Sequence, residues 1–120
     1  MVYEKDWFMR EIKAFVESIA RLVFKRDHVR YEVADESRLT ETDMLHRALT
    51  ALLLSGKICE AEDYLFAYCT PGNRSHLLVA LDFYQRLGEM RDEDLEKANF
   101  SRAEILEGLR DITSRFDLDL

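Results

Sequence analysis

Residues 3–26 most limit how this chain can fold, because they carry a wide apolar stripe at helical spacing. On a helical wheel the stripe fills a sector roughly 120° wide, with charged side chains opposite it. Its members are Phe8, Ile12, Phe15, Val16, Ile19, Leu22 and Val23, whereas Tyr3, Trp7 and Phe24 lie outside the sector. Such a stripe must be covered by the rest of the chain, a second copy, another protein or a membrane. The stretch predicts a long amphipathic helix over residues 4–26, and what covers it bears on function.

Four later stretches repeat apolar side chains at helical spacing, over residues 41–55, 58–69, 73–88 and 101–116. The expected N-caps are Thr40, Asn73 or Ser75, and Ser101, the last in a capping box with Glu104. Gly56 leaves almost no loop, so the first two of these helices should form an antiparallel hairpin. The helix over residues 73–88 is too apolar for the surface and should lie centrally.

The remaining segments lack a helical period. Residues 27–39 are expected to form an irregular connecting arm, the acidic stretch 91–99 a solvated loop anchored by Leu95 and Phe100, and residues 117–120 a frayed tail. A chain of 120 residues fits one domain, 1–120, with its helical hairpins over residues 40–116. The fold class expected is all-α, with about five helices in an antiparallel hairpin array.

Part of this array, residues 41–69, resembles a tetratricopeptide repeat. The residues that carry the resemblance are Leu45, Leu49, Leu52, Gly56, Ile58, Ala61 and Leu65. The pattern departs from the repeat at Leu52, where an aromatic residue is usual, and at Pro71, which comes early. A generic helical hairpin and a repeat-like unit with a peptide-binding groove therefore both stay open.

Three further segments carry a resemblance over the whole chain: Tyr3 to Ile12, Ala20 to Phe24 and Phe100 to Leu109. In these the chain resembles a small family of uncharacterised bacterial proteins, mainly from low-GC Gram-positive organisms and known only as a domain of unknown function. The match is poorest over residues 27–39. The resemblance implies an all-helical cytosolic protein and supplies no known catalytic residues.

The charge distribution separates residues 1–26 from the rest. They hold six basic and four acidic side chains, whereas residues 27–120 hold eleven basic and twenty acidic ones. The overall charge of −7 disfavours binding of nucleic acid, which needs clustered cations. No stretch predicts a membrane-spanning helix, the start does not resemble a signal peptide, and two cysteines without CxxC spacing indicate reduced thiols in the cytoplasm.

No motif predicts a catalytic, cofactor or metal site. His28, His46 and His76 lack the spacing that places two imidazoles on one helix face, and the acidic run after Arg91 lacks the glycine of a calcium loop. Cys59 and Cys69 are expected to be buried packing residues. We expect no cofactor and no metal ion.

Three functions stay open, with a protein–protein interaction or self-association module favoured over the others. We expect a homodimer, or a complex with another protein, through a candidate interface of Tyr3, Trp7, Phe8, Phe15, Ile19 and Phe24. The first alternative is peripheral membrane association through the N-terminal helix, which Glu11, Glu17 and the acidic remainder of the chain disfavour. The second is a ligand-binding or enzymatic pocket between helices, for which Tyr64, Tyr68, Tyr84, His46 and His76 are the candidates.

Overall fold

A computed structural model describes residues 2–26 and 29–116, with the side chains of residues 2–4 left out. The expected all-helical fold is confirmed, and these described residues contain no strand. The elements are α1 (Val2–Ile19), the π-helical turn η1 (Ala20–Phe24), α2 (Glu41–Leu54), α3 (Ile58–Tyr68), α4 (Arg74–Gly88), α5 (Asp92–Lys97) and α6 (Arg102–Ser114). None of these helices is long and apolar enough to cross a membrane, and the expected cytoplasmic location stays a prediction.

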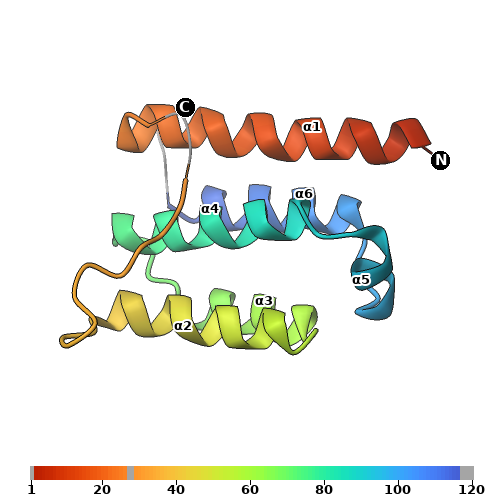
Figure 1. Cartoon of the computed structure of the whole chain (residues 1–120). Coiled ribbons are helices and arrows are strands. Elements are labelled where there is room, and N and C mark those ends of the chain that lie inside the picture. Colours follow the sequence, from red (N-terminus) through yellow and green to blue (C-terminus); the bar gives the residue numbers. More distant parts are fainter. Residues whose placement is uncertain (1, 27–28, 117–120) are drawn as a thin grey trace.

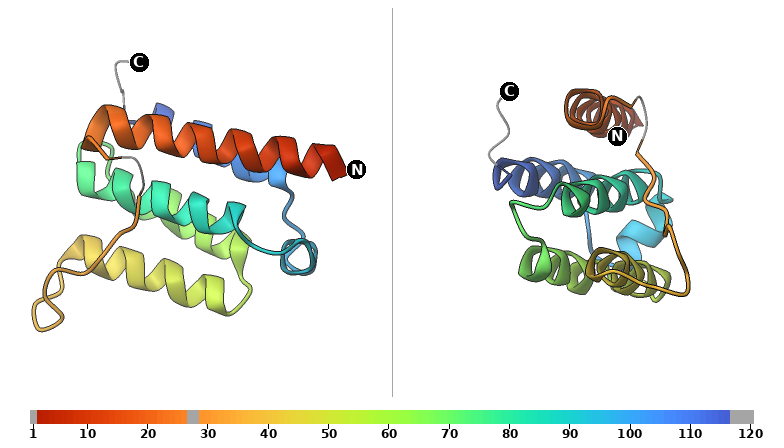
Figure 2. Two further views of the ribbon diagram at one scale, coloured as in Figure 1. Left: turned by 45° about the horizontal axis from the view of Figure 1, so that its top comes forward. Right: turned by 90° about the vertical axis from the view of Figure 1, so that its left-hand side faces the viewer.

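The helices form three layers, and the middle layer consists of α4 and α6 (Figure 1). The hairpin of α2 and α3 covers one face of this layer, whereas α1 alone covers the other (Figure 2). Ten of the 15 residues of α4 are buried, so its predicted central position is confirmed. One face of the middle layer is thus covered by two helices and the other by one.

The predicted turn chemistry of the hairpin is confirmed. Gly56 has a φ of +74°, which strains most side chains but not glycine. The backbone N–H of Lys57 donates to the carbonyl of Leu52 at 2.9 Å, and that of Gly56 to Leu53 at 3.0 Å. These two bonds are a Schellman motif, which ends α2 and sends α3 back alongside it.

The predicted N-caps are also present. The side chains of Thr40 and Ser101 each accept from the backbone N–H three residues on and complete a capping box, with Asp43 and Glu104 respectively. Asn73, the first of the two alternatives, caps α4 by accepting from Ser75 and His76. Local sequence therefore sets where α2, α4 and α6 begin.

The prediction of a solvated loop over residues 91–99 is wrong, because the acidic run forms α5. Three acidic residues occupy the first turn of α5, where they are stabilised by the positive end of the helix dipole. Leu95 and Phe100 are buried, as expected of the anchors. Asn99, with a φ of +55°, closes α5 with the bond from Phe100 N–H to the Leu95 carbonyl at 3.0 Å.

The end of the N-terminal helix departs from the expected stripe because η1 is π-helical. Hydrogen bonds between residues five apart hold more residues per turn than an α-helix, so each residue rotates by less than about 100°. Leu22, expected in the buried stripe, is therefore turned outward and is 48% exposed. Phe24, expected outside the stripe, packs against the core.

The connecting arm is irregular over its described residues 29–39, as predicted. Val29 is buried, and the Tyr31 hydroxyl donates a short hydrogen bond to Asp43 on α2. Asp27, His28 and the predicted tail 117–120 lie outside the described residues.

Candidate interaction surface

One side of α1 exposes apolar and small side chains, interrupted by the charged residues Arg10 and Glu11 between Trp7 and Ala14. Trp7 is 46% exposed and Leu22 48%, and Ala14 and Ser18 lie exposed between them. We call these four residues the α1 flank. The hydroxyl of Ser18 donates to the carbonyl of Ala14 at 2.8 Å. Because that donor is satisfied within the helix, a partner can cover the flank without leaving it unpaired.

The α1 flank lies on the outer side of α1. The side of α1 with Met9 and Lys13 lines a groove shared with α4. On the helical wheel Trp7 and Ala14 lie far from that groove and nearly opposite the buried Val16. These two flank residues therefore face away from the middle layer, of which α1 alone covers this face (Figure 2).

The predicted interface residues divide between core and surface. Ile19 is 2% exposed and is a core residue, whereas Phe8, Phe15 and Phe24 are half-buried and pack against the core. The side chain of Tyr3 lies outside the described residues. Trp7 is the large exposed side chain among them, with its ring edge on Phe8 at a centroid distance of 4.9 Å.

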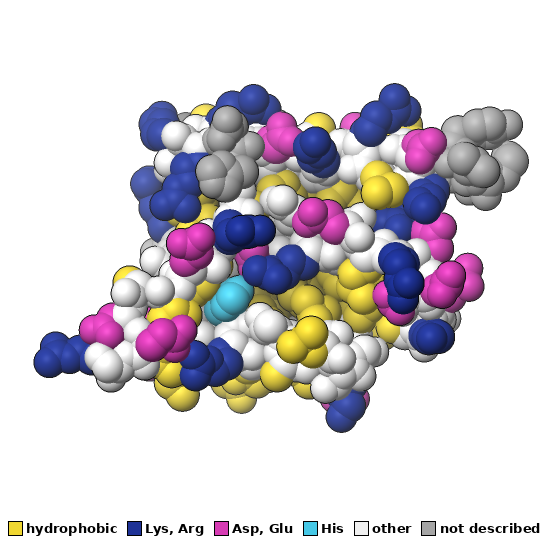
Figure 3. All heavy atoms as spheres, viewed as in Figure 1, with side chains coloured by type: hydrophobic (Ala, Val, Ile, Leu, Met, Phe, Trp, Pro, Cys, Tyr) yellow, Lys and Arg dark blue, Asp and Glu magenta, His cyan; other side chains and the backbone are white. Residues whose placement is uncertain are grey.

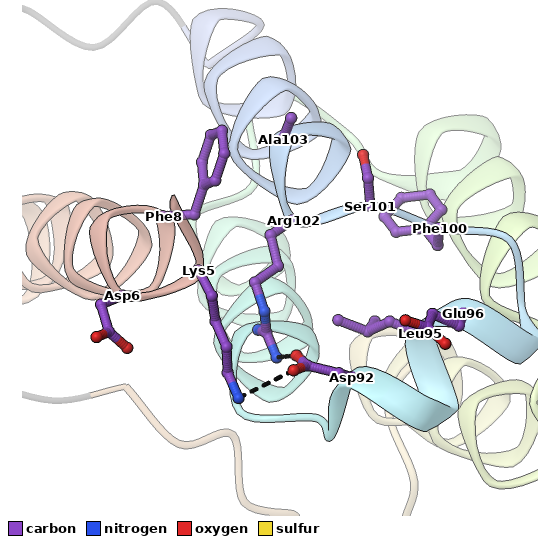
Figure 4. Close-up of a pocket in the computed structure, with 10 residues that line it drawn as sticks. All are labelled: Lys5, Asp6, Phe8, Asp92, Leu95, Glu96, Phe100, Ser101, Arg102 and Ala103. Carbon is purple, nitrogen blue, oxygen red and sulfur yellow. Dashed lines mark hydrogen bonds and ion pairs between the residues drawn. The ribbon is translucent and has the colours of Figure 1, made fainter. Parts of the chain in front are cut away.

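A pocket of about 720 Å³ opens below the N-terminal end of α1 (Figure 4). Phe8, Leu95 and Phe100 form its apolar wall, and Ala103 lies at the start of α6. Three of its charged groups bind one another: Asp92 accepts from Lys5 at 3.0 Å and from Arg102 at 2.8 Å. These two cations lower the pKa of Asp92, Arg102 more than Lys5. These two ion pairs thus tie α1, α5 and α6 together.

Arg102 is the centre of this network, and sequence reasoning missed it. It is 8% exposed and donates to the carbonyls of Gly88 at 2.9 Å and Met90 at 2.8 Å. These carbonyls lie at and just after the C-terminal end of α4, where cations are favourable. The available signal was a cation in the first turn of a helix, a position that the helix dipole disfavours.

The predicted pocket residues do not form one site. His46 lies 3.1 Å from Asp82, and the His46 ring lies against Tyr31. Asp82 also accepts a hydrogen bond from Arg86 at 2.9 Å. Tyr64 and Tyr68 lie against each other on α3, with ring centroids 4.5 Å apart.

The two remaining candidates, His76 and Tyr84, are also engaged elsewhere. His76 is buried and its Nδ1 accepts from Thr70 N–H at 2.9 Å, while burial lowers its pKa. Tyr84 donates to Glu62 of α3 at 2.6 Å. Each of the five candidates thus holds two elements together, stacks within one helix or caps a turn.

Asp43 serves the N-cap of α2, and the backbone hydrogen bond from Thr40 and the Tyr31 hydroxyl lower its pKa. Cys59 was expected to be buried, and this is wrong. It is exposed because its position on α3 faces away from α2 and α4. Cys69 is half-buried, and burial raises its pKa to about 11. No group of side chains that could hold a metal ion occurs within the described residues.

Glu62 lies in an acidic groove between α3 and α6, with Glu104, Glu107 and Asp111. Burial raises the pKa of Glu62, the hydrogen bond from Tyr84 opposes this, and the carboxylates of Asp63, Glu104 and Asp111 add to it. Burial and the carboxylate of Glu62 also raise the pKa of Tyr84. Ionised Glu62 is thus less favourable in the folded than in the unfolded chain.

This raised pKa predicts a pH dependence of stability. Between the ordinary value of 4.5 and its own pKa, the folded chain retains a proton on Glu62 that the unfolded chain has lost. The Glu62 contribution to stability is therefore complete below 4.5 and is lost as the pH rises through the folded pKa. Glu62→Gln should remove this loss, so urea unfolding from pH 4.5 toward neutrality will show a flatter dependence than the wild type. Glu107→Gln, on the exposed side of the groove, should leave the dependence unchanged, and equal slopes for wild type and Glu62→Gln would contradict the account.

The face of the molecule drawn in Figure 3 has a different arrangement of charged and apolar side chains from the α1 flank. Figure 3 shows Lys and Arg side chains along α1, and hydrophobic side chains gathered in a hollow between α4 and α2 toward α5. That hollow lies between two packed layers. The α1 flank differs because α1 is alone in its layer, so no second helix lies beside it (Figure 2).

Comparison with known proteins adds one finding. A protein-family model described as a family of unknown function (DUF6483) matches residues 2–117. No curated protein and no solved structure matches the chain. The tetratricopeptide likeness and the mainly Gram-positive range of the family therefore stay predictions.

Proposed function

We propose that this chain, which belongs to the family of unknown function DUF6483, is a non-catalytic interaction module that self-associates through the α1 flank. The observation that carries the proposal is the exposure of Trp7 and Leu22 beside a face of the middle layer that a single helix covers. Exposed aromatic residues of this kind supply most of the binding energy at protein interfaces. A second copy that covers the flank would bury them both.

The membrane alternative has less support from the surface. The charged side of α1 includes Glu17, which lies within 4.0 Å of both Lys13 and Arg21. Cations paired in this way attract anionic lipid more weakly than free ones. The net negative remainder of the chain opposes the same attraction.

The self-association proposal is tested by a charged substitution at the exposed tryptophan. Trp7→Glu should weaken the dimer by roughly 30-fold or more, since a buried interface cannot accept an unpaired carboxylate where an aromatic anchor was. Light scattering at tens of micromolar will then give one chain mass for the variant and twice that mass for the wild type. Leu54→Glu is the matched control, because Leu54 is 85% exposed on α2, in the layer farthest from α1. A Trp7→Glu variant with the wild-type mass would refute the flank as the interface, and flotation of the wild type with anionic vesicles would favour the membrane alternative.

A further inference from the structure

We propose that the hydrogen bond between Thr70 and His76 is an acid-sensitive latch, which opens the connection between α3 and α4 when His76 binds a proton. This connection, residues 69–73, joins the hairpin layer to the middle layer (Figure 1). The latch is a property of the single chain, so self-association through the α1 flank neither requires it nor excludes it.

The connection between α3 and α4 is closed by hydrogen bonds at both of its ends. The backbone N–H of Asn73 donates to the Thr70 carbonyl at 3.0 Å, which closes a turn over residues 70–73. Asn73 Oδ1 accepts from the backbone N–H groups of Ser75 at 2.9 Å and His76 at 3.3 Å, at the start of α4. The backbone N–H of Thr70 donates to Nδ1 of His76 at 2.9 Å. The His76 side chain thus joins the end of α3 to the first turn of α4.

The latch uses the one atom of the His76 ring that can take up a proton. A neutral imidazole has a proton on one nitrogen and a free lone pair on the other. Because Nδ1 accepts from Thr70, the proton lies on Nε2, which is buried and has no hydrogen-bond partner among the described residues. A second proton can bind only to Nδ1, where the Thr70 N–H already occupies the lone pair. The charged form of His76 and the closed latch therefore exclude each other.

The surroundings of the ring also favour its neutral form. His76 is 5% exposed, and burial lowers its pKa more than the charge of Glu41 on α2 raises it. Cys69, at the end of α3, remains a neutral thiol because burial raises its pKa to about 11, although Arg115, which follows α6, favours the thiolate. On α4 itself, Arg74 is exposed to solvent. A cationic ring lacks acceptors for its two N–H groups here and finds them in water once the connection opens.

The sign of the pH dependence follows from this exclusion. The open connection binds a proton and the closed one does not, so the open population should rise about tenfold for each pH unit below the ordinary value of 6.5. The latch therefore holds above 6.5 and weakens as the pH falls. Glu62 contributes the opposite dependence to overall stability, because its pKa is raised. A measurement at the latch itself separates the two.

Hydrogen exchange of the Thr70 amide, followed by NMR, measures the opening of the latch. Exchange of an open amide is catalysed by hydroxide and slows about tenfold for each pH unit from 6.5 down to about 4.5. In the wild type the increased opening should cancel this slowing, so the Thr70 rate should stay nearly constant. In His76→Asn, the side-chain oxygen can accept from Thr70 without binding a proton, so the rate should fall about tenfold per unit. The amide of Lys57, which donates to the Leu52 carbonyl, is the control and should slow in both proteins.

The wild-type ring gives a second test that needs no variant. Nitrogen NMR of the His76 imidazole, assigned through the coupling across its hydrogen bond to the Thr70 amide, should show the Nε2–H form at neutral pH. The ring should titrate well below 6.5.

A constant Thr70 exchange rate in the wild type, together with slowing in His76→Asn, supports the latch. An Nδ1–H form, a His76 pKa of 6.5 or above, or a Thr70 rate that slows equally in both proteins overturns it. A Lys57 amide that follows the Thr70 amide in the wild type also overturns it, because acid then unfolds the chain as a whole instead of opening this connection.

Discussion

Replacement of Arg102 by methionine will lower the free energy of unfolding by about 3 kcal/mol. The guanidinium group makes three hydrogen bonds, to the carbonyls of Gly88 and Met90 and to Asp92. Methionine retains an unbranched apolar stem but leaves the buried carbonyl of Gly88 without this donor. Urea denaturation with the slope held common to both variants gives the difference.

Two companion variants separate the contributions of Arg102. Arg102→Lys retains a cation but not the planar fork that reaches Gly88, Met90 and Asp92 at once, so its stability should fall between those of the wild type and Arg102→Met. Asp92→Asn, at an exposed carboxylate, should cost less than Arg102→Met. A methionine variant as stable as the wild type would mean that these bonds exchange for water without cost.

Substitution of Gly108 by alanine will also destabilise the fold, by about 2 kcal/mol. A Cβ atom at Gly108 would lie 2.6 Å from the hydroxyl oxygen of Tyr84 and 3.0 Å from its ring, and would overlap the carboxylate of Glu62. Tyr84 is fully buried, so its ring cannot move aside without disturbing the core. The loss is measured as the shift in the urea midpoint.

The effect of Gly108→Ala can be assigned to this contact by a double variant. Tyr84→Phe removes the hydroxyl that the new methyl group meets, so the second substitution should cost less in that background than in the wild type. Gly72→Ala is the control, since a Cβ at Gly72 has no atom within 4 Å. Equal costs at Gly72 and Gly108 would show that helix propensity or loop entropy, rather than packing, decides both.

Those features of the fold that depend on local sequence could be predicted. The caps at Thr40 and Ser101 and the left-handed stop at Gly56 act through bonds to neighbouring backbone, so short motifs reveal them. The π-helical turn at residues 20–24 could not be seen, because apolar spacing at about 100° per residue assumes an α-helix throughout. α5 was missed because its stability depends on Leu95 and Phe100 packing against distant helices as well as on its acidic first turn.

The candidate surface could be predicted only in outline. The sequence identified α1 as the source of exposed apolar side chains, yet it could not say which of them the core would cover. Trp7 and Phe8 are adjacent, and their different exposures follow from where α6 lies. Arg102 shows the same limit, since its partners Gly88 and Met90 come from another helix and the loop after it.

The central claim, self-association through α1, is tested most directly by sedimentation equilibrium of the unmodified chain over a range of concentrations. One chain has a mass of 14.2 kDa. The account predicts a concentration-dependent approach to twice that mass, with no larger species, because a two-fold contact closes on itself. A mass of one chain at tens of micromolar, unchanged on further concentration, would contradict it.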